Sequence, residues 1–129
     1  MSKPGLPNQI KIFIIETLSS IGQLEVLLLL YRNRGKSWTA TEVGEAMKSS
    51  KMAAIQQLEE LHTKSLVSRL TKNSTSLYEF NASKEQEETV EMLSKYYHDY
   101  RVLIVTLIYD KKGGAMQSLA DAFKIRKND

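Results

Sequence analysis

Residues 36–70, KSWTATEVGEAMKSSKMAAIQQLEELHTKSLVSRL, decide the fold of this chain. Two runs with the apolar spacing of helices are separated by a short polar turn, and the second run leads into a stretch in which apolar and polar residues alternate. The question is whether this is ordinary helical packing or a helix-turn-helix that places one helix in a DNA groove.

The first run begins with a helix-start signal. Residues 39–42, Thr-Ala-Thr-Glu, form a capping box, in which the Thr39 hydroxyl and the Glu42 carboxylate satisfy end amides reciprocally. The predicted inward face of this short helix consists of Val43, Ala46 and Met47. Residues 48–50 are a polar turn, in which either serine can cap the next helix.

The second run predicts a helix that ends near Thr63. At 100° per residue, one side of it carries a packing face, made of Ala54, Ile55, Leu58, Leu61 and His62. The other side carries Ser49, Ala53, Gln56, Gln57 and Glu60. We therefore expect one face to pack and the other to contact a partner.

Beyond Ser65 the period changes to two. Residues 67–71 and 77–80 predict two strands of a hairpin with a polar tip at 72–76, and Trp38 is a candidate for a third short strand. Helix, helix, turn, helix and hairpin is the order of a winged helix-turn-helix. The predicted fold class is mainly α with a small β-hairpin wing, flanked by N- and C-terminal helices.

The flanking segments complete the expected organisation. Residues 1–8 contain both prolines and are predicted to be a flexible leader, residues 9–35 to be N-terminal helices, and residues 36–82 to be the winged helix-turn-helix core. Residues 83–129 are expected to hold a long dimerisation helix, which a capping box of Ser83 and Gln86 opens and Gly113-Gly114 ends, and then a short helix near 116–125.

The long helix predicts a homodimer. Its apolar residues follow a heptad seam, and residues 102–109 are apolar on every side, so they need cover on every side. The expected interface consists of Val90, Leu93, Tyr97, Tyr100, Ile104, Leu107 and Ile108. The alternative is that the chain's own helices provide all of this cover.

Charge points to the same middle segment. The net charge is +3, and residues 31–80 alone hold eight basic against five acidic side chains, a difference of three. A local positive surplus suits contact with phosphate, although a solvated surface gives the same count. With double-stranded DNA as partner, the expected contacts are Ser49, Ser50, Lys51, Ala53, Gln56 and Gln57 from the second helix, and Arg69, Lys72 and Asn73 from the wing.

Residues 24–70 resemble the winged-helix domain of bacterial transcriptional regulators of the MarR-like type. The resemblance rests on residues 22–27 before the motif, the bracing helix at 39–47, and Leu58-Glu59-Glu60-Leu61 followed by Leu66-Val67-Ser68-Arg69. Ser65 replaces the usual glycine, and the wing lacks the acidic-x-arginine motif common in that type. The resemblance implies a homodimer formed by flanking helices and a possible small aromatic effector, for which Tyr96, Tyr97, Tyr100 and Tyr109 are candidate lining residues.

Other classes of function have little support. His62 and His98 have no nucleophile or metal-ligand partner at a meaningful spacing, and there is no cysteine and no glycine-rich phosphate loop. We therefore expect no enzyme, metal or cofactor. No apolar run approaches the roughly 20 residues of a membrane span, no secretory signal opens the chain, and a cytoplasmic protein is expected. The alternative function is a winged helix that contacts protein and no nucleic acid.

Overall fold

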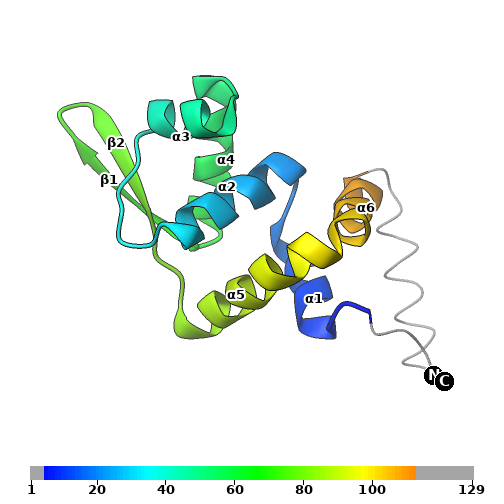
Figure 1. The fold of residues 1–129 in the computed structure, drawn as a ribbon. Coiled ribbons are helices and arrows are strands. Elements are labelled where there is room, and N and C mark those ends of the chain that lie inside the picture. The colour runs from blue at the N-terminus through cyan, green and yellow to red at the C-terminus, as the bar shows by residue number, and fades with distance from the viewer. Residues whose placement is uncertain (1–4, 113–129) are drawn as a thin grey trace.

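A computed structural model describes residues 5–112, and within that range it contains six helices and one antiparallel hairpin (Figure 1). The elements are α1 (Asn8–Thr17), α2 (Ile21–Arg32), α3 (Ala40–Met47), α4 (Lys51–Thr63), β1 (Val67–Lys72), β2 (Thr75–Phe80), α5 (Lys84–Asp99) and α6 (Arg101–Lys112). This confirms the predicted fold class. The expected glycine helix stop at 113–114 and the expected short helix at 116–125 lie outside the described residues, as do residues 1–4 of the expected leader.

Side-chain caps start four of the helices, and those at Thr39, Ser50 and Ser83 stand where the sequence predicts. Both bonds of the Thr39–Glu42 capping box are formed, at 2.9 and 3.1 Å. Ser50 Oγ accepts the Ala53 amide at 3.0 Å at the start of α4, and Ser20 and Ser83 cap α2 and α5 in the same way. Because these bonds satisfy end amides that would otherwise lack a partner, the cap residues determine where each helix begins.

The hairpin is longer than predicted and its tip is shorter. Val67 pairs with Phe80 and Lys72 with Thr75, which leaves a two-residue turn of Asn73 and Ser74 with φ of 53° and 66°. Positive φ at both central residues is the geometry whose twist matches that of paired strands. Trp38 and Tyr78 exchange two backbone hydrogen bonds of 2.7 Å, so the third short strand is confirmed as a single bridge.

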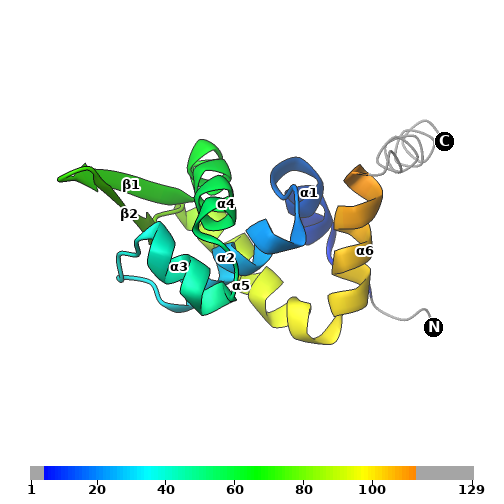
Figure 2. The ribbon, with the colours of Figure 1, turned by 90° about the horizontal axis from the view of Figure 1, so that it is seen from above.

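The elements form an elongated arrangement with the wing at one end. The hairpin projects beside α3 and α4, α1 and α6 lie together at the opposite end, and α2 and α5 run between them (Figures 1 and 2). The corner between α1 and α2 is held by Gln23, which is fully buried. Its amide accepts the Ser19 backbone N–H and donates to the Thr17 carbonyl, so a sharp turn is made without unsatisfied polar groups.

The prediction of one long helix from Ser83 to Asp110 is wrong. The helix breaks at Tyr100, where φ is −120° and ψ is 33°, and α6 turns to pack on α1. Val90, Leu93 and Ile104 are each completely buried within the single chain, and Ile108 and Leu107 nearly so. The heptad spacing therefore reflects two helices that cover the same core from different directions, and these five residues offer little or no surface to a second chain.

One inward position of α3 is also corrected. Ala46 is exposed, whereas Ala40 and Gly44 are buried beside Val43. The buried face of α3 therefore lies nearer the N-terminal end of the helix than predicted. Gly44 belongs to this face because the turn after α3 packs closely against it.

Candidate nucleic-acid interface

The turn between α3 and α4 is tight. Lys48 takes a left-handed conformation with φ of 55°, and the Ser49 amide donates to the Gly44 carbonyl at 2.8 Å. A Cβ at Gly44 would stand 3.2 Å from the Ser49 carbonyl oxygen and 3.3 Å from that of Ser50. Glycine at this position therefore lets α3 brace the start of α4.

The outward face of α4 differs from the predicted one. Ala54, Leu58 and Leu61 are fully buried, and Met52 and Gln56 lie on the opposite side, with Met52 79% exposed. The predicted contact residues Ser49, Ser50 and Lys51 are exposed as expected, and Ala53 is half-buried.

Two side chains at the edges of that face were assigned to the wrong side. Gln57 is partly buried, and its amide fills the space where a Cβ would stand at Gly22 of α2, so it packs between helices instead of facing outward. Ile55, predicted to pack in the core, is 36% exposed. The missing side chain of Gly22 creates the room for Gln57, and no property of α4 alone signals it.

A groove separates α4 from the wing. It has a volume of about 280 Å³, and its lining comes from the start of α3, from α4 and from β2: Thr39, Ala40, Thr41, Lys51, Ile55, Ser74, Thr75, Ser76 and Tyr78. Hydroxyl groups dominate this lining, and Lys51 is its one charged residue. The groove therefore offers hydrogen-bonding groups beside a cation and an apolar side chain.

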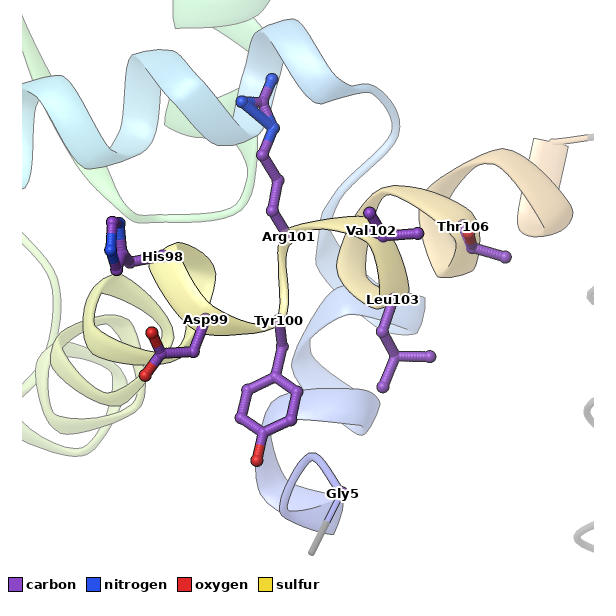
Figure 3. A pocket seen from close by; sticks show the side chains of 8 residues that line it. All are labelled: Gly5, His98, Asp99, Tyr100, Arg101, Val102, Leu103 and Thr106. Atoms are coloured by element: carbon purple, nitrogen blue, oxygen red, sulfur yellow. The ribbon is translucent and has the colours of Figure 1, made fainter. Parts of the chain in front are cut away.

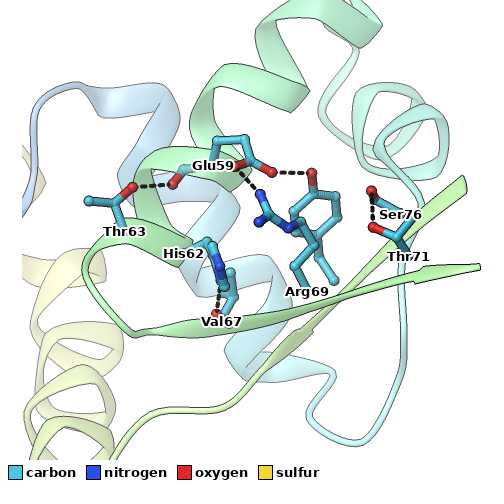
Figure 4. A network of polar contacts seen from close by, with 8 residues as sticks. Glu59, His62, Thr63, Val67, Arg69, Thr71 and Ser76 are labelled. Atoms are coloured by element: carbon cyan, nitrogen blue, oxygen red, sulfur yellow. Dashed lines mark hydrogen bonds and ion pairs between the residues drawn. The ribbon is translucent and has the colours of Figure 1, made fainter. Parts of the chain in front are cut away.

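A polar network fixes the wing to α4 (Figure 4). One carboxylate oxygen of Glu59 is paired with the Arg69 guanidinium, and the other accepts a hydrogen bond of 2.6 Å from the Tyr78 hydroxyl. The Tyr78 and Arg69 hydrogen bonds lower the pKa of Glu59. Burial, together with the bond to Glu59, raises the pKa of Tyr78 to about 12. The lowered pKa of Glu59 favours the ionised carboxylate, and the raised pKa of Tyr78 favours the neutral phenol. These are the charge states in which the hydrogen bonds with Arg69 and Tyr78 form.

This network corrects the expected role of Arg69. Its guanidinium is engaged by Glu59 on the side of the hairpin that faces α4, so it is not available as an outward wing contact in this conformation. The sequence contained the signal, because Glu59 stands one helical turn before the end of α4 and Arg69 follows on β1, but the pairing depends on the angle between helix and hairpin.

The other basic residues of the middle segment differ in their partners. Arg34 pairs with Glu87 at 3.5 Å, and Lys64 donates to the Glu16 carbonyl at 3.0 Å. Arg32 and Lys36 are exposed away from α4, with the Lys36 ammonium 3.9 Å from the centroid of the Trp38 ring. Lys48, Lys51 and Lys72 are exposed in the turn, in α4 and in the wing, form no ion pair within residues 5–112, and of these three Lys51 lines the groove. Asn73 is exposed at the wing tip.

A second cavity, of about 640 Å³, lies at the break between α5 and α6 (Figure 3). Its lining is Gly5, His98, Asp99, Tyr100, Arg101, Val102, Leu103 and Thr106. Tyr100 points toward Gly5, whereas Arg101 points the other way, toward α2, where it pairs with Glu25 at 3.7 Å.

The four tyrosines proposed for an effector pocket do not line one cavity. Only Tyr100 borders the large one. Tyr97 donates to Glu25 at 3.1 Å, Tyr96 stacks on Tyr100 with ring centroids 5.5 Å apart, and Tyr109 is 68% exposed.

Among residues 5–112, no three His, Asp or Glu side chains gather as a metal site would require. No single helix in this range has the length and apolar character of a membrane span; α1 and α2 reach it only when taken together, across a bend of 114°.

Comparisons with known proteins bear on the fold. No protein-family model and no curated protein sequence matches the chain. Among solved structures, HlyU from Vibrio cholerae N16961 is 21% identical with a TM-score of 0.55, over 72% of this chain and 98% of that one. A possible transcriptional regulator from Methanosarcina mazei Go1 is 11% identical with a TM-score of 0.56, over 82% and 92% of the two chains.

A third structure was solved with nucleic acid. The complex of Staphylococcus aureus MepR with DNA is 15% identical with a TM-score of 0.53, over 94% of this chain and 89% of that one. At such identities these neighbours show the fold alone: this chain shares their fold, which here is a winged helix-turn-helix.

Proposed function

We propose that this protein is a sequence-specific DNA-binding transcriptional regulator that acts in the cytoplasm as a homodimer, and that it is not an enzyme. The proposal rests on one observation: the capped start of α4 and the wing border one groove, whose lining includes Lys51, and a second cation, Lys72, is exposed on β1 of the same wing, neither lysine being in an ion pair within residues 5–112. The MepR neighbour, which matches most of this chain, was solved with DNA bound.

In this proposal α4 enters the major groove and the wing contacts the backbone or the minor groove. The capped N-terminus of α4, with Ser49 and Ser50, favours a phosphate because its amides and dipole attract negative charge. Gln56, exposed two turns into the helix, is able to bond an adenine edge. Lys72 and Asn73 supply the wing contacts.

Arg69 has a positioning role in this scheme. Through Glu59 it holds β1 against α4 and thereby sets the distance between the wing and the recognition helix. Gln57 likewise packs α4 on α2 and does not read bases.

The homodimer is proposed to form through α6. Val102 is 80% exposed, and Leu103 and Tyr109 are also exposed, whereas Ile104, Leu107 and Ile108 of the same helix are covered. Exposed large apolar side chains gathered on one helix are typical of a surface that a second chain covers.

A salt titration tests the DNA proposal. The affinity of the full chain for a random duplex is measured at several salt concentrations, followed by selection from randomised duplexes. Phosphate contacts release counterions, so the logarithm of affinity should fall steeply with the logarithm of salt concentration. The selected sites should be two-fold symmetric with half-site centres about 10 bp apart or a multiple of it. Weak binding with no salt dependence, or the absence of any selected site, would contradict the proposal.

A specific observation supports a second candidate, a winged helix that contacts protein. Met52 and Ile55 on α4 and Leu70 on β1 are large exposed apolar side chains, and Glu59 neutralises one of the wing's cations. The same titration separates the two candidates, because a protein-contact module has no reason to bind duplex DNA.

A further inference from the structure

The recognition helix presents apolar side chains where hydrogen-bonding groups are expected. Met52 is the second residue of α4 and is 79% exposed, and Ile55 follows one turn later with 36% exposure. Neither is needed to fill the core, since Ala54, Leu58 and Leu61 make the buried side of the helix. These two residues, here called the apolar pair, lie within two turns of the Ser50 cap.

The surroundings of the apolar pair are cationic. Lys51 precedes Met52 and borders the same groove as Ile55, Lys48 is exposed in the turn before α4, and the negative charge of Glu59, one turn after Ile55, is compensated by Arg69. The helix N-terminus adds the positive end of its dipole. A surface of this kind is complementary to a polyanion that itself offers apolar groups.

In the major groove of DNA, the apolar group is the 5-methyl of thymine. The other base edges there present only hydrogen-bond donors and acceptors, so a methionine or isoleucine has no other favourable contact. Two residues three apart in a helix are separated by about 4.5 Å along its axis. This distance is slightly longer than the roughly 3.4 Å between neighbouring base pairs, so the two side chains can reach neighbouring base pairs of the duplex.

We propose that Met52 and Ile55 bind the 5-methyl groups of two thymines in each half-site, and so determine the preference of the protein for thymine over cytosine at those positions. The inference rests on the DNA-binding function proposed above and specifies how the helix reads sequence. Gln56 lies beside the pair and reads the adenine edge, so one A·T pair satisfies both kinds of contact.

The test removes the methyl group and nothing else. In a duplex that the native full chain has selected, thymines of the half-site are replaced one at a time by deoxyuridine, which keeps all base-pairing groups. Each contacted methyl should contribute about fourfold to affinity, which corresponds to ~0.8 kcal/mol for one buried carbon group. The expected result is a loss of about that size at two positions per half-site and none elsewhere.

Alanine variants test whether Met52 and Ile55 are the residues that contact the thymine methyl groups. In Met52→Ala, the ratio between the thymine and deoxyuridine duplexes should fall to about one at one position, and in Ile55→Ala at the other. Ile12→Ala is the matched control, because Ile12 is an exposed apolar residue on α1, far from the groove, and its ratios should equal those of the native protein.

Every outcome bears on the inference. Equal affinity of the native protein for thymine and deoxyuridine duplexes overturns it and leaves the DNA-binding function standing. Ratios retained in both alanine variants overturn it as well, because the methyl groups would then be read by other residues. Failure of the native protein to bind any duplex removes the proposed function and the inference with it, and would leave the apolar pair to a protein partner.

Discussion

Both ends of the molecule expose large apolar side chains, but the residues that surround these side chains differ between the two ends. At the winged end, the apolar residues Met52, Ile55 and Leu70 are exposed on the same two elements, α4 and β1, as the cations Lys51 and Lys72. At the opposite end, α6 exposes Val102, Leu103 and Tyr109 in a run whose other residues, apart from Thr106, are apolar. Exposed apolar surface therefore points to two kinds of partner: a polyanion that carries methyl groups at the first end, and a second apolar surface at the other.

The largest expected effect separates covered from exposed residues within α6. Ile104→Asp places a carboxylate in a fully buried site, where burial without a partner is costly. We expect the melting temperature, measured by circular dichroism, to fall by on the order of 10 °C or more. Thr106→Asp, two residues later but exposed and outside the proposed interface, should leave the melting temperature nearly unchanged. Similar losses in both variants would show that α6 does not have the two faces described.

The second prediction concerns assembly. The double variant Val102→Asp, Leu103→Asp introduces like charges into the proposed interface of α6 while leaving Ile104, Leu107 and Ile108 in place. The native protein should sediment as a dimer at micromolar concentration and the variant as a folded monomer. If the native protein sediments as a monomer, the exposed apolar surface of α6 is not covered by a second copy of the chain, and the proposed difference between the partners of the two ends is wrong.

The third prediction compares cations at the winged end. Lys51→Ala with Lys72→Ala should weaken binding to all duplexes and reduce the salt slope by about two, one for each lost phosphate contact. Arg69→Ala should reduce the slope by less than one, because its charge is already compensated by Glu59. A slope that falls most in Arg69→Ala would mean that DNA displaces Glu59 and that the ion pair opens on binding.

The sequence predicted the winged end better than the opposite end, for a physical reason. Caps at Thr39, Ser50 and Ser83 are local signals, since the bonds they form span three residues. The pattern change after Ser65 is local as well, so the hairpin was predicted to within a residue or two. The break at Tyr100 has no such signal, because neither proline nor glycine marks it and the heptad spacing continues through it.

Errors in the candidate site have the same origin. The orientations of Gln57 and Arg69 depend on groups distant in sequence, the space above Gly22 and the carboxylate of Glu59. A helical wheel of α4 locates the centre of each face but not its edges. Met52 is not among the predicted contacts because methionine is expected in a core, and its exposure in the structure identifies it as an outward residue.

The fourth prediction uses pH to test how the winged end is held together. Tyr78 has a pKa near 12 in the folded protein, above its ordinary value of 10.0, so the folded state favours the neutral phenol. Its contribution to stability is complete below pH 10 and is lost as the pH rises toward 12. Glu59→Gln removes the carboxylate and should lower the pKa of Tyr78, although burial will keep it above 10. The pKa is read from the phenolate absorbance difference between each protein and its Tyr78→Phe counterpart, and an unchanged value would contradict the network.

The smallest expected effect concerns the two residues that connect neighbouring elements, Ser65 between α4 and β1 at the winged end and Tyr100 between α5 and α6 at the opposite end. Ser65 joins α4 to the wing in a left-handed conformation with φ of 63°, and its amide and that of Leu66 close the helix end on the carbonyls of His62 and Leu61 at 2.9 and 3.0 Å. This closing motif usually has glycine at the left-handed position, because a side chain there is strained. Tyr100 joins α5 to α6 at a negative φ of −120°, where glycine brings no relief.

Ser65→Gly should therefore stabilise the fold by about 0.5–1 kcal/mol, the strain relief being partly offset by the greater freedom of glycine in the unfolded chain. Tyr100→Gly should destabilise it, since it adds that freedom and removes a ring that stacks on Tyr96. Chemical denaturation of both variants measures the difference, with the slope against denaturant expected to stay unchanged. Because Ser65 lies outside the α4–wing groove, Ser65→Gly should bind duplex DNA as the native protein does. A Ser65→Gly protein that is less stable than the native one would show that the joint is not strained, and that the wing is positioned by the Glu59 network alone.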